Sequence, residues 1–140
     1  EIPLRLVGSE MCIRDRDKKI PEAIIRLTGI TEELLASEGT DKSKALSEFA
    51  MRCNGKPLVG HNIGFDLNFI KSACAENKID FVPSKIIDTV KISRKLLDIN
   101  SYSLSAIADY LDLHYNKDRI HRALDDCLLT QRIYEKLKEI

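Results

Sequence analysis

One stretch of this 140-residue chain, positions 57–66, most constrains what the sequence can fold into. It begins with a short apolar run at 57–59, which predicts a buried strand. Gly60 and Gly64 follow and interrupt regular structure. A helical pattern then runs from Asp66 to about position 77, with apolar residues spaced to share one face. A polar residue between a strand and a helix is where α/β proteins present chemistry, so Asp66 is either a helix N-cap or a functional carboxylate.

A second stretch, from His121 to Asp126, opens the final helix, which is predicted from about position 122 to the C-terminus. Because His121 lies just before this helix, its imidazole can face the same cleft as the carboxylate of Asp126. Asp125 would point about a hundred degrees away around the helix. Helix N-termini favour anionic groups, so Asp66 and Asp126 are expected to stay ionised. A neutral histidine near pH 7 can accept a proton from water.

Together the two stretches resemble the DnaQ-like 3′–5′ exonucleases, the DEDDh branch of the RNase H-like superfamily. This family includes the proofreading epsilon subunit of bacterial DNA polymerase III. Its second motif looks like the His-Asn-Ile-Gly-Phe-Asp sequence at 61–66, and its third motif looks like His121 and Asp126. The segment at 25–31, Ile-Arg-Leu-Thr-Gly-Ile-Thr, looks like the part that the family places beside the substrate's 3′ end. The resemblance covers roughly 17–140, and motifs in the family's order are more specific than either alone.

The resemblance implies a metal-dependent exonuclease that releases nucleoside monophosphates from single-stranded 3′ ends, with DNA favoured over RNA. It assigns metal binding to Asp66 and Asp126, and the role of general base to His121. It implies two Mg²⁺ or Mn²⁺ ions, which clamp the attacking and leaving oxygens of a phosphodiester. The implied partners are a DNA or RNA 3′ end and a DNA polymerase subunit. The expected substrate contacts are Thr28, Gly29, Ile30, Asn62 and Phe65.

Two other functions remain open. One is a degenerate domain that binds nucleic-acid ends or a polymerase partner without catalysis. The other is an unrelated metal-dependent hydrolase that shares Asp and His residues by chance. An Asp-x-Glu motif on an apolar strand upstream would favour the exonuclease over the degenerate domain.

The first motif of the family, a strand with Asp-x-Glu, does not occur before the Thr-Gly-Ile segment. The nearest acidic residues, Glu10, Asp15 and Asp17, have the wrong spacing. Residues 6–16 look like a translated sequencing adapter, so we interpret 1–16 as a non-native segment and 17–140 as the exonuclease domain. The alternative is a divergent N-terminus in which residues 2–7 form a strand. Without Asp-x-Glu, the chain as written is expected to be a poor nuclease of reduced stability.

Alternating short strands and helices predict an α/β fold with a mixed sheet. The resemblance implies an RNase H-like sheet with helices on both sides and without its native first strand. Helices are expected at 22–27, after Thr31, after Thr40 or Asp41, and at 66–77, 90–97, 103–111 and 122–140, with strands at 57–60 and 85–89. Asp88 either caps a helix or orients the site. The inward residues of the last helix are predicted to be Leu124, Cys127, Leu128, Ile133 and Leu137.

Several residues near the motifs have competing interpretations. His61 is interpreted as structural and His114 as solvent-exposed. Asn62 either hydrogen-bonds substrate or braces its loop. Phe65 and Phe69 are interpreted as core residues rather than base-stacking surfaces, although the resemblance places Phe65 among the substrate contacts.

Charge and composition limit the partners. Acidic and basic residues balance at 22 each, which argues against a tight binder of long duplexes but not against an enzyme that grips a few terminal nucleotides. The sequence has no apolar run long enough to span a bilayer, so we expect no membrane contact and a cytoplasmic location. The cysteines form no Cys-x-x-Cys pair and are expected to be reduced thiols: Cys12, Cys53, Cys74 and Cys127.

Overall fold

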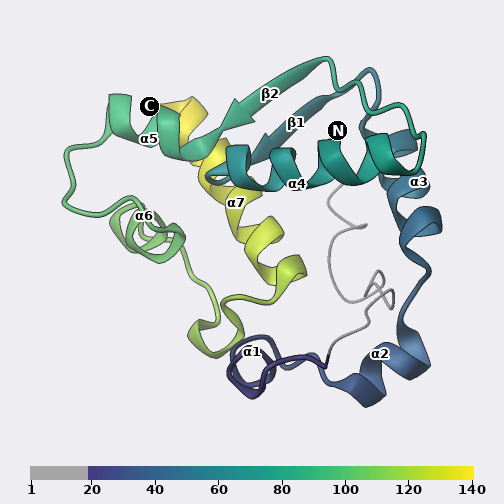
Figure 1. The fold of residues 1–140 in the computed structure, drawn as a ribbon. Coiled ribbons are helices and arrows are strands. Elements are labelled where there is room, and N and C mark those ends of the chain that lie inside the picture. Colours follow the sequence, from purple (N-terminus) through teal and green to yellow (C-terminus); the bar gives the residue numbers. More distant parts are fainter. Residues whose placement is uncertain (1–18) are drawn as a thin grey trace.

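The fold was determined as a computed structural model, which describes residues 19–140. Helices and strands alternate along this part of the chain, so the predicted α/β class is confirmed. The expectations for residues 1–16 lie outside the described residues. The elements, shown in Figure 1, are α1 (Glu22–Thr28), α2 (Glu32–Glu38), α3 (Lys42–Cys53), β1 (Pro57–Gly60), α4 (Ile63–Glu76), β2 (Lys85–Asp88), α5 (Thr89–Leu96), α6 (Leu104–Tyr110), the 3-10 helix η2 (Lys117–Arg119) and α7 (Ala123–Glu139).

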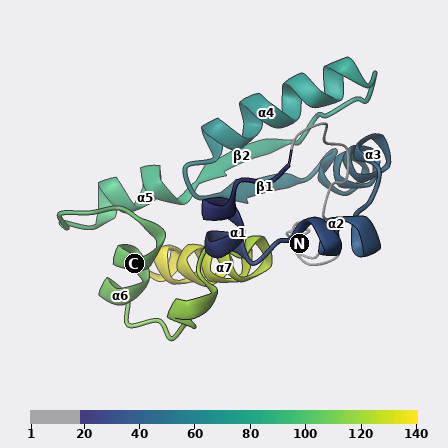
Figure 2. The same cartoon turned by 60° about the horizontal axis from the view of Figure 1, so that its bottom comes forward.

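The two strands of the described residues pair in parallel. Pro57 lies opposite Lys85, and Gly60 lies opposite Asp88, so both strands end at the same edge of the sheet. Helix α4 makes the crossover between them, as parallel pairing requires. Figure 2 shows the sheet between α4 and α7, which confirms the expectation of helices on both sides. Among residues 19–140, antiparallel pairing is limited to one isolated bridge, Asn54 with Pro83.

Most predicted helix caps are present, because a cap depends on residues close in sequence. Thr31 Oγ1 accepts a hydrogen bond from Leu34 N at 3.1 Å, and Asp41, rather than Thr40, accepts from Lys44 N at 3.3 Å. Ser103 caps α6 in the same way. Such a cap stabilises a helix by about 1 kcal/mol. The caps therefore set where α2, α3 and α6 begin.

Helix α4 begins at Ile63, three residues before the predicted start, so the interpretation of Asp66 as an N-cap was wrong. The N-cap is Asn62, whose φ of 55° is left-handed, and Gly64 lies inside the first turn. Asparagine tolerates this conformation better than most residues, and it lets the chain turn sharply from β1 into the helix. Asp66 consequently lies within the first turn of α4, where its carboxylate does not cap the helix.

Three regions of apolar packing hold the elements together, the smallest of them Leu46, Ala73 and Cys74 between α3 and α4. The largest joins α6 and α7 with the end of α5, and it consists of Leu97, Ile107, Ala108, Leu129, Ile133 and Leu137. The other lies around β1 and the start of α4, and it consists of Cys53, Leu58, Ile63 and Leu67. Helix α7 contacts both α5 and β1, so it fixes the largest region against the sheet.

Three apolar residues predicted to point inward do not. Phe65 is 79% exposed and Phe69 is 69% exposed, because they lie opposite the buried face of α4 that carries Ile63 and Leu67. Leu128 is 45% exposed for a similar reason, since the buried stripe of α7 passes through its neighbour at 129 instead. Apolar character was a poor guide at these positions because helical phase decides burial.

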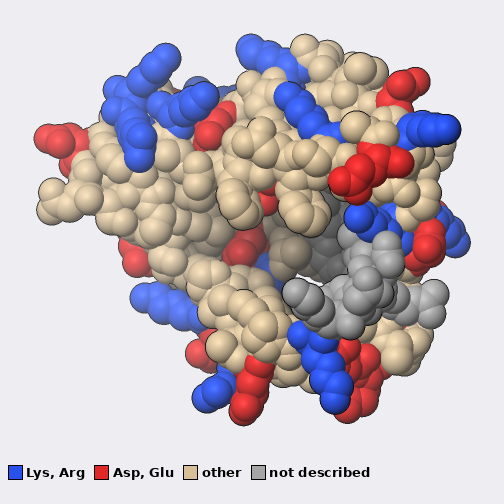
Figure 3. Space-filling model, in the orientation of Figure 1, with Lys and Arg blue, Asp and Glu red and all other residues tan. Residues whose placement is uncertain are grey.

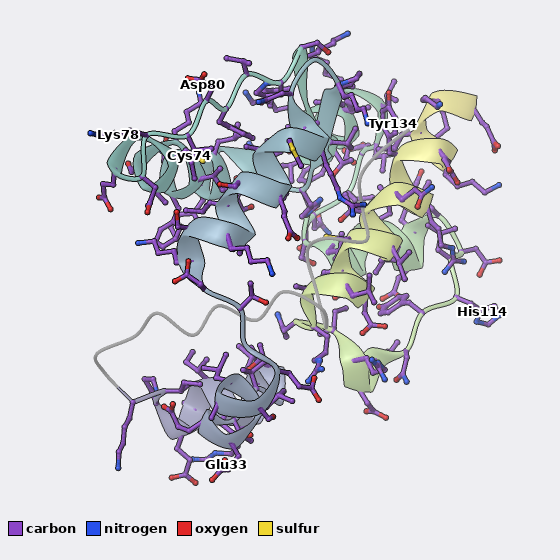
Figure 4. All side chains as sticks on the ribbon, turned by 90° about the vertical axis from the view of Figure 1, so that its right-hand side faces the viewer. Glu33, Cys74, Lys78, Asp80, His114 and Tyr134 are labelled. Atoms are coloured by element: carbon purple, nitrogen blue, oxygen red, sulfur yellow. The ribbon has the colours of Figure 1, made fainter. Side chains whose placement is uncertain are left out.

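Other expectations are confirmed. Figure 4 shows His114 projecting outward from the loop between α6 and α7. Cys53 and Cys74 are buried and free, and Cys127 is partly buried and free. In the part of the chain from 19 to 140, none of the helices has the length and apolar character needed to cross a membrane.

Candidate active site

The polar residues of the two motifs gather at the edge where both strands end. His61 directly follows β1, Asp88 ends β2, and Asp66 lies in the first turn of α4. Helix α7 packs against β1 and brings Asp126, in its first turn, to the same region. The parallel sheet therefore explains how motifs far apart in sequence share one edge.

His61 has a structural role, as its neighbours predicted. Its Nδ1 lies 2.8 Å from Thr89 Oγ1 and its Nε2 lies 3.0 Å from the carbonyl oxygen of Tyr102. A carbonyl only accepts, so Nε2 carries the proton of the neutral ring. Burial lowers the pKa of His61, while the Tyr102 carbonyl and the charges of Asp88 and Asp126 oppose this shift. The ring therefore ties the end of β1 to the chain beyond α5.

Asp88 is the N-cap of α5, one of its two predicted roles, and it also contacts the loop after β1. Its Oδ1 accepts hydrogen bonds from Val90 N and Asn62 N, each at 3.0 Å. One carboxylate thus joins the turn after β1 to the start of α5. The backbone of Asn62 therefore braces the loop, while the residue itself remains exposed and its side chain is accessible to a ligand.

His121 and Asp126 are in direct contact through the backbone. His121 N donates to Asp126 Oδ1 at 3.1 Å, and His121 itself, with a left-handed φ of 72°, is exposed. Burial raises the pKa of Asp126, partly offset by this hydrogen bond and by the charge of His121. Asp125 is held elsewhere, because its Oδ2 accepts from Arg119 Nε at 3.0 Å. The two neighbouring carboxylates therefore have different partners.

The charges of Asp66 and Asp126 both act on the thiol of Cys127. Burial raises the pKa of Cys127 to about 11, and the charges of Asp126 and Asp66 add to the shift. Burial also raises the pKa of Asp66, although the residue as a whole is exposed. Within residues 19–140, no group of three His, Cys, Asp or Glu side chains is close enough to hold a metal ion. The donors present are carboxylate oxygens, the kind that Mg²⁺ and Mn²⁺ prefer.

The Thr28–Gly29–Ile30 segment also reaches this region. Gly29 ends α1 with a left-handed φ of 74°, and Ile30 N donates to Thr28 Oγ1 at 3.2 Å. The carbonyl oxygen of Thr28 accepts a hydrogen bond from Arg122 Nη1 at 2.7 Å. This contact joins the segment to the residue between His121 and α7. The sequence motifs did not indicate it, because 94 positions separate the two partners.

Two surface features flank Asp66 and Asp126. The exposed rings of Phe65 and Phe69 lie one turn apart on α4, on either side of Asp66 in sequence. Beside α7 is a cavity of about 320 Å³ lined by Tyr115, Asn116, Ile120, Asp125, Asp126, Leu128, Leu129, Gln131 and Arg132. Figure 3 shows a separate view of the surface below α4, where acidic side chains lie near a hollow.

Comparison with known proteins places the chain in a family. A family model described as an exonuclease, RNase_T, matches residues 9–134. The chain is 32% identical over 129 residues to the 3′-5′ exonuclease DinG of Staphylococcus epidermidis, an alignment that covers 89% of this chain and 14% of DinG. It is 33% identical over 129 residues to the PolC-type DNA polymerase III of Caldanaerobacter subterraneus subsp. tengcongensis, covering 86% of this chain and 9% of that protein.

A shorter relative is similar over more of its length. The chain is 32% identical over 121 residues to the DNA polymerase III subunit epsilon of Aquifex aeolicus, covering 86% of this chain and 58% of the subunit. The chain thus spans less than two thirds of each of these relatives. Since the family match extends over most of the sequence and includes both motifs, the chain belongs to the RNase_T exonuclease family, which confirms the resemblance to the DnaQ-like exonucleases.

Proposed function

We propose that this domain is a metal-dependent 3′–5′ exonuclease that removes nucleoside monophosphates from single-stranded DNA ends. The observation that carries the proposal is the hydrogen bond from His121 N to Asp126 Oδ1 at the start of α7, a helix that packs against β1, whose end leads through His61 and Asn62 into α4 and Asp66. The printed names of relatives, a 3′-5′ exonuclease and DNA polymerase III proteins, support the direction of cleavage and the choice of DNA. The same names support a DNA polymerase subunit as a partner.

In this proposal Asp66 and Asp126 hold Mg²⁺ or Mn²⁺, with two ions in the complete site. Bound metal would stabilise the charge on the attacking and leaving oxygens of the phosphodiester. Burial raises the pKa of both carboxyl groups, so their charged forms gain from a nearby cation. Their oxygen donors suit these ions better than zinc or copper.

His121 is the proposed general base. Its residue is exposed, so the imidazole can reach a water molecule, and its backbone hydrogen bond holds it beside Asp126. A neutral imidazole takes a proton from the attacking water near neutral pH. His61 does not serve this purpose, because both of its ring nitrogens already have partners.

Substrate contacts are proposed on both sides of the carboxylates. Thr28, Gly29 and Ile30 would form a wall against the terminal nucleotide, and the side chain of Asn62 would hydrogen-bond the strand. Phe65 would stack on a base, since its ring is exposed next to Asp66. Figure 3 also shows basic side chains gathered over α5, which carries Lys91, Arg94 and Lys95 and no acidic residue. These charges would attract the phosphates of the strand.

The test is an end-labelled degradation assay. A single-stranded DNA with a 5′ label is incubated with the protein and Mg²⁺, Mn²⁺ or excess EDTA, beside the same DNA with a blocked 3′ end and an RNA of the same sequence. A version whose first sixteen residues are replaced by an apolar strand with Asp-x-Glu should shorten the DNA one nucleotide at a time from the free 3′ end, only with metal, and the chain as written should do so slowly or not at all. Binding of the 3′ end without cleavage by the version with Asp-x-Glu, under every metal condition, would instead favour the non-catalytic, end-binding domain.

A further inference from the structure

The contact between Arg122 and α1 carries an inference about how the proposed site is assembled. Arg122 Nη1 donates to the carbonyl oxygen of Thr28 at 2.7 Å, in a partly buried position. That oxygen is one of the carbonyls at the C-terminus of a helix that lack a partner within the helix. A guanidinium group satisfies it and complements the negative end of the helix dipole. This placement makes Arg122 the anchor of the α1 C-terminus.

Glycine at position 29 permits the contact. A Cβ atom built at Gly29 would lie 2.6 Å from Arg122 Nη1. Cβ atoms in proteins do not come this close to another heavy atom, so the guanidinium group would have to move. The φ of 74° adds a second reason for glycine, because most residues avoid this conformation. The backbone at position 29 and the side chain at position 122 therefore fit one another closely.

The backbone of Arg122 sits in the middle of the third motif. Its carbonyl oxygen accepts from Asp126 N at 2.9 Å, and its own N–H donates to Arg119 O at 3.1 Å. His121, immediately before it, donates to the carboxylate of Asp126 at 3.1 Å. One residue thus contacts α1 through its side chain and the His121–Asp126 pair through its backbone.

We infer that Arg122 is a positioning residue that sets the distance between the wall for the terminal nucleotide and the general base. It touches neither the substrate nor the metal, and it acts through Thr28, Gly29 and Ile30. This inference rests on the proposed function, since the wall and the base are proposed roles. It makes Arg122 responsible for holding the last nucleotide at the right depth in the site.

The test separates this role from a general contribution to stability. Arg122→Ala removes the contact that holds the segment Thr28–Gly29–Ile30 in place. The terminal nucleotide then loses contacts that it makes equally in the ground state and the transition state. KM should therefore rise while kcat is largely kept. A hydrogen bond from a charged donor predicts a rise in KM of roughly ten- to a hundredfold. Arg122→Lys keeps the charge and one donor, and should restore much of the loss. Gly29→Ala should mimic Arg122→Ala by displacing the guanidinium.

A matched control and a double variant sharpen the result. Arg119→Ala removes another arginine from the same loop, one that pairs with Asp125 and not with α1, and should leave KM within about twofold, as surface ion pairs contribute little. The KM of the variant with both Arg122→Ala and Gly29→Ala should be no higher than that of the worse single variant, because both remove the same contact. A lowered kcat with unchanged KM would overturn the inference, since Arg122 would then act only through His121.

Failure of the inference is distinguishable from failure of the proposed function. If a version whose first sixteen residues are replaced by an apolar strand with Asp-x-Glu also cleaves no DNA with metal, the proposed function is wrong. The role of Arg122 can still be tested by binding. Fluorescence anisotropy measures the Kd of an oligonucleotide with a 3′-hydroxyl end without turnover, and Arg122→Ala should raise this Kd by the factor predicted for KM. Cleavage by the version with Asp-x-Glu together with unchanged KM and Kd in Arg122→Ala overturns the role of Arg122 alone. Thermal melting of each variant checks that it is folded.

Discussion

Removing the exposed rings of α4 should weaken binding of single-stranded DNA without weakening the fold. Phe65 and Phe69 are 79% and 69% exposed, so their truncation to alanine gives up little buried area and should change the free energy of unfolding by less than about 0.5 kcal/mol. Stacking of a base on an aromatic ring contributes about 1–3 kcal/mol. Phe65→Ala should therefore raise Kd roughly 5- to 150-fold.

The two rings should act on different bases. Four residues of α-helix rise about 6 Å, whereas bases stacked within one strand of a duplex are about 3.4 Å apart. Phe69→Ala should add its own loss, so the double variant should lose more than either single variant. A strand with separated bases fits this spacing better than a stacked one, which agrees with a single-stranded substrate.

The measurement is fluorescence anisotropy of a labelled single-stranded DNA with Ca²⁺ present, because its irregular coordination suits catalysis poorly. Met51→Ala is the control, since Met51 is 75% exposed on α3, away from both motifs. The reasoning is refuted if the double variant binds as tightly as Met51→Ala. A loss of stability of several kcal/mol in either phenylalanine variant would show instead that the ring is buried in solution.

Three further outcomes are expected at the carboxylates and the histidine, and the two on cleavage apply to a chain whose first strand with Asp-x-Glu is restored. Asp126→Asn should abolish metal-dependent cleavage because an amide is a poorer Mg²⁺ ligand, while Asp125→Asn should be mild; equal losses in a steady-state assay would show that the wrong carboxylate was chosen. His121→Ala should lower kcat on the order of 10²–10⁴-fold, and a loss below tenfold would exclude it as the general base. Burial raises the pKa of Asp66, so its charge opposes folding once the pH exceeds that pKa; Asp66→Asn should therefore raise Tm at neutral pH in EDTA, and a lowered Tm would contradict the shift.

Local signals in the sequence were sufficient for most of the secondary structure. The strand at 57–60 follows from a short apolar run next to glycine, and the caps at Thr31, Asp41 and Ser103 follow from residues within one turn. Each of these features depends on nearby positions, so no knowledge of the tertiary fold was needed. The start of α4 was misplaced because Asn62 adopts a left-handed conformation that the spacing of apolar residues does not reveal.

Features that depend on the tertiary fold were not accessible in the same way. The exposure of Phe65 and Phe69 depends on which face of α4 meets the sheet, and both faces carry apolar residues. The contact of Arg122 with Thr28 joins positions 94 apart in sequence. Neither an arginine nor a threonine at these positions predicts such a contact. The roles of Asp66, His121 and Asp126 came from the family resemblance and not from spacing, and they stay predictions until the variants are measured.

The reactivity of the buried cysteines reports how often the apolar packing around them opens. Cys53 lies in the packing around β1, and Cys74 lies in the neighbouring packing of α3 and α4. Burial, helped by the neighbouring Cys74, raises the pKa of Cys53 to about 11, so at pH 8 only on the order of one thiol in a thousand is the reactive thiolate. Reaction with a thiol reagent therefore has to wait for the packing to separate. Mass spectrometry of peptides labelled over time would then measure the opening rate at each cysteine. Equal rates at Cys53 and Cys74 would show that the two packing regions open together, and different rates would show that they open separately.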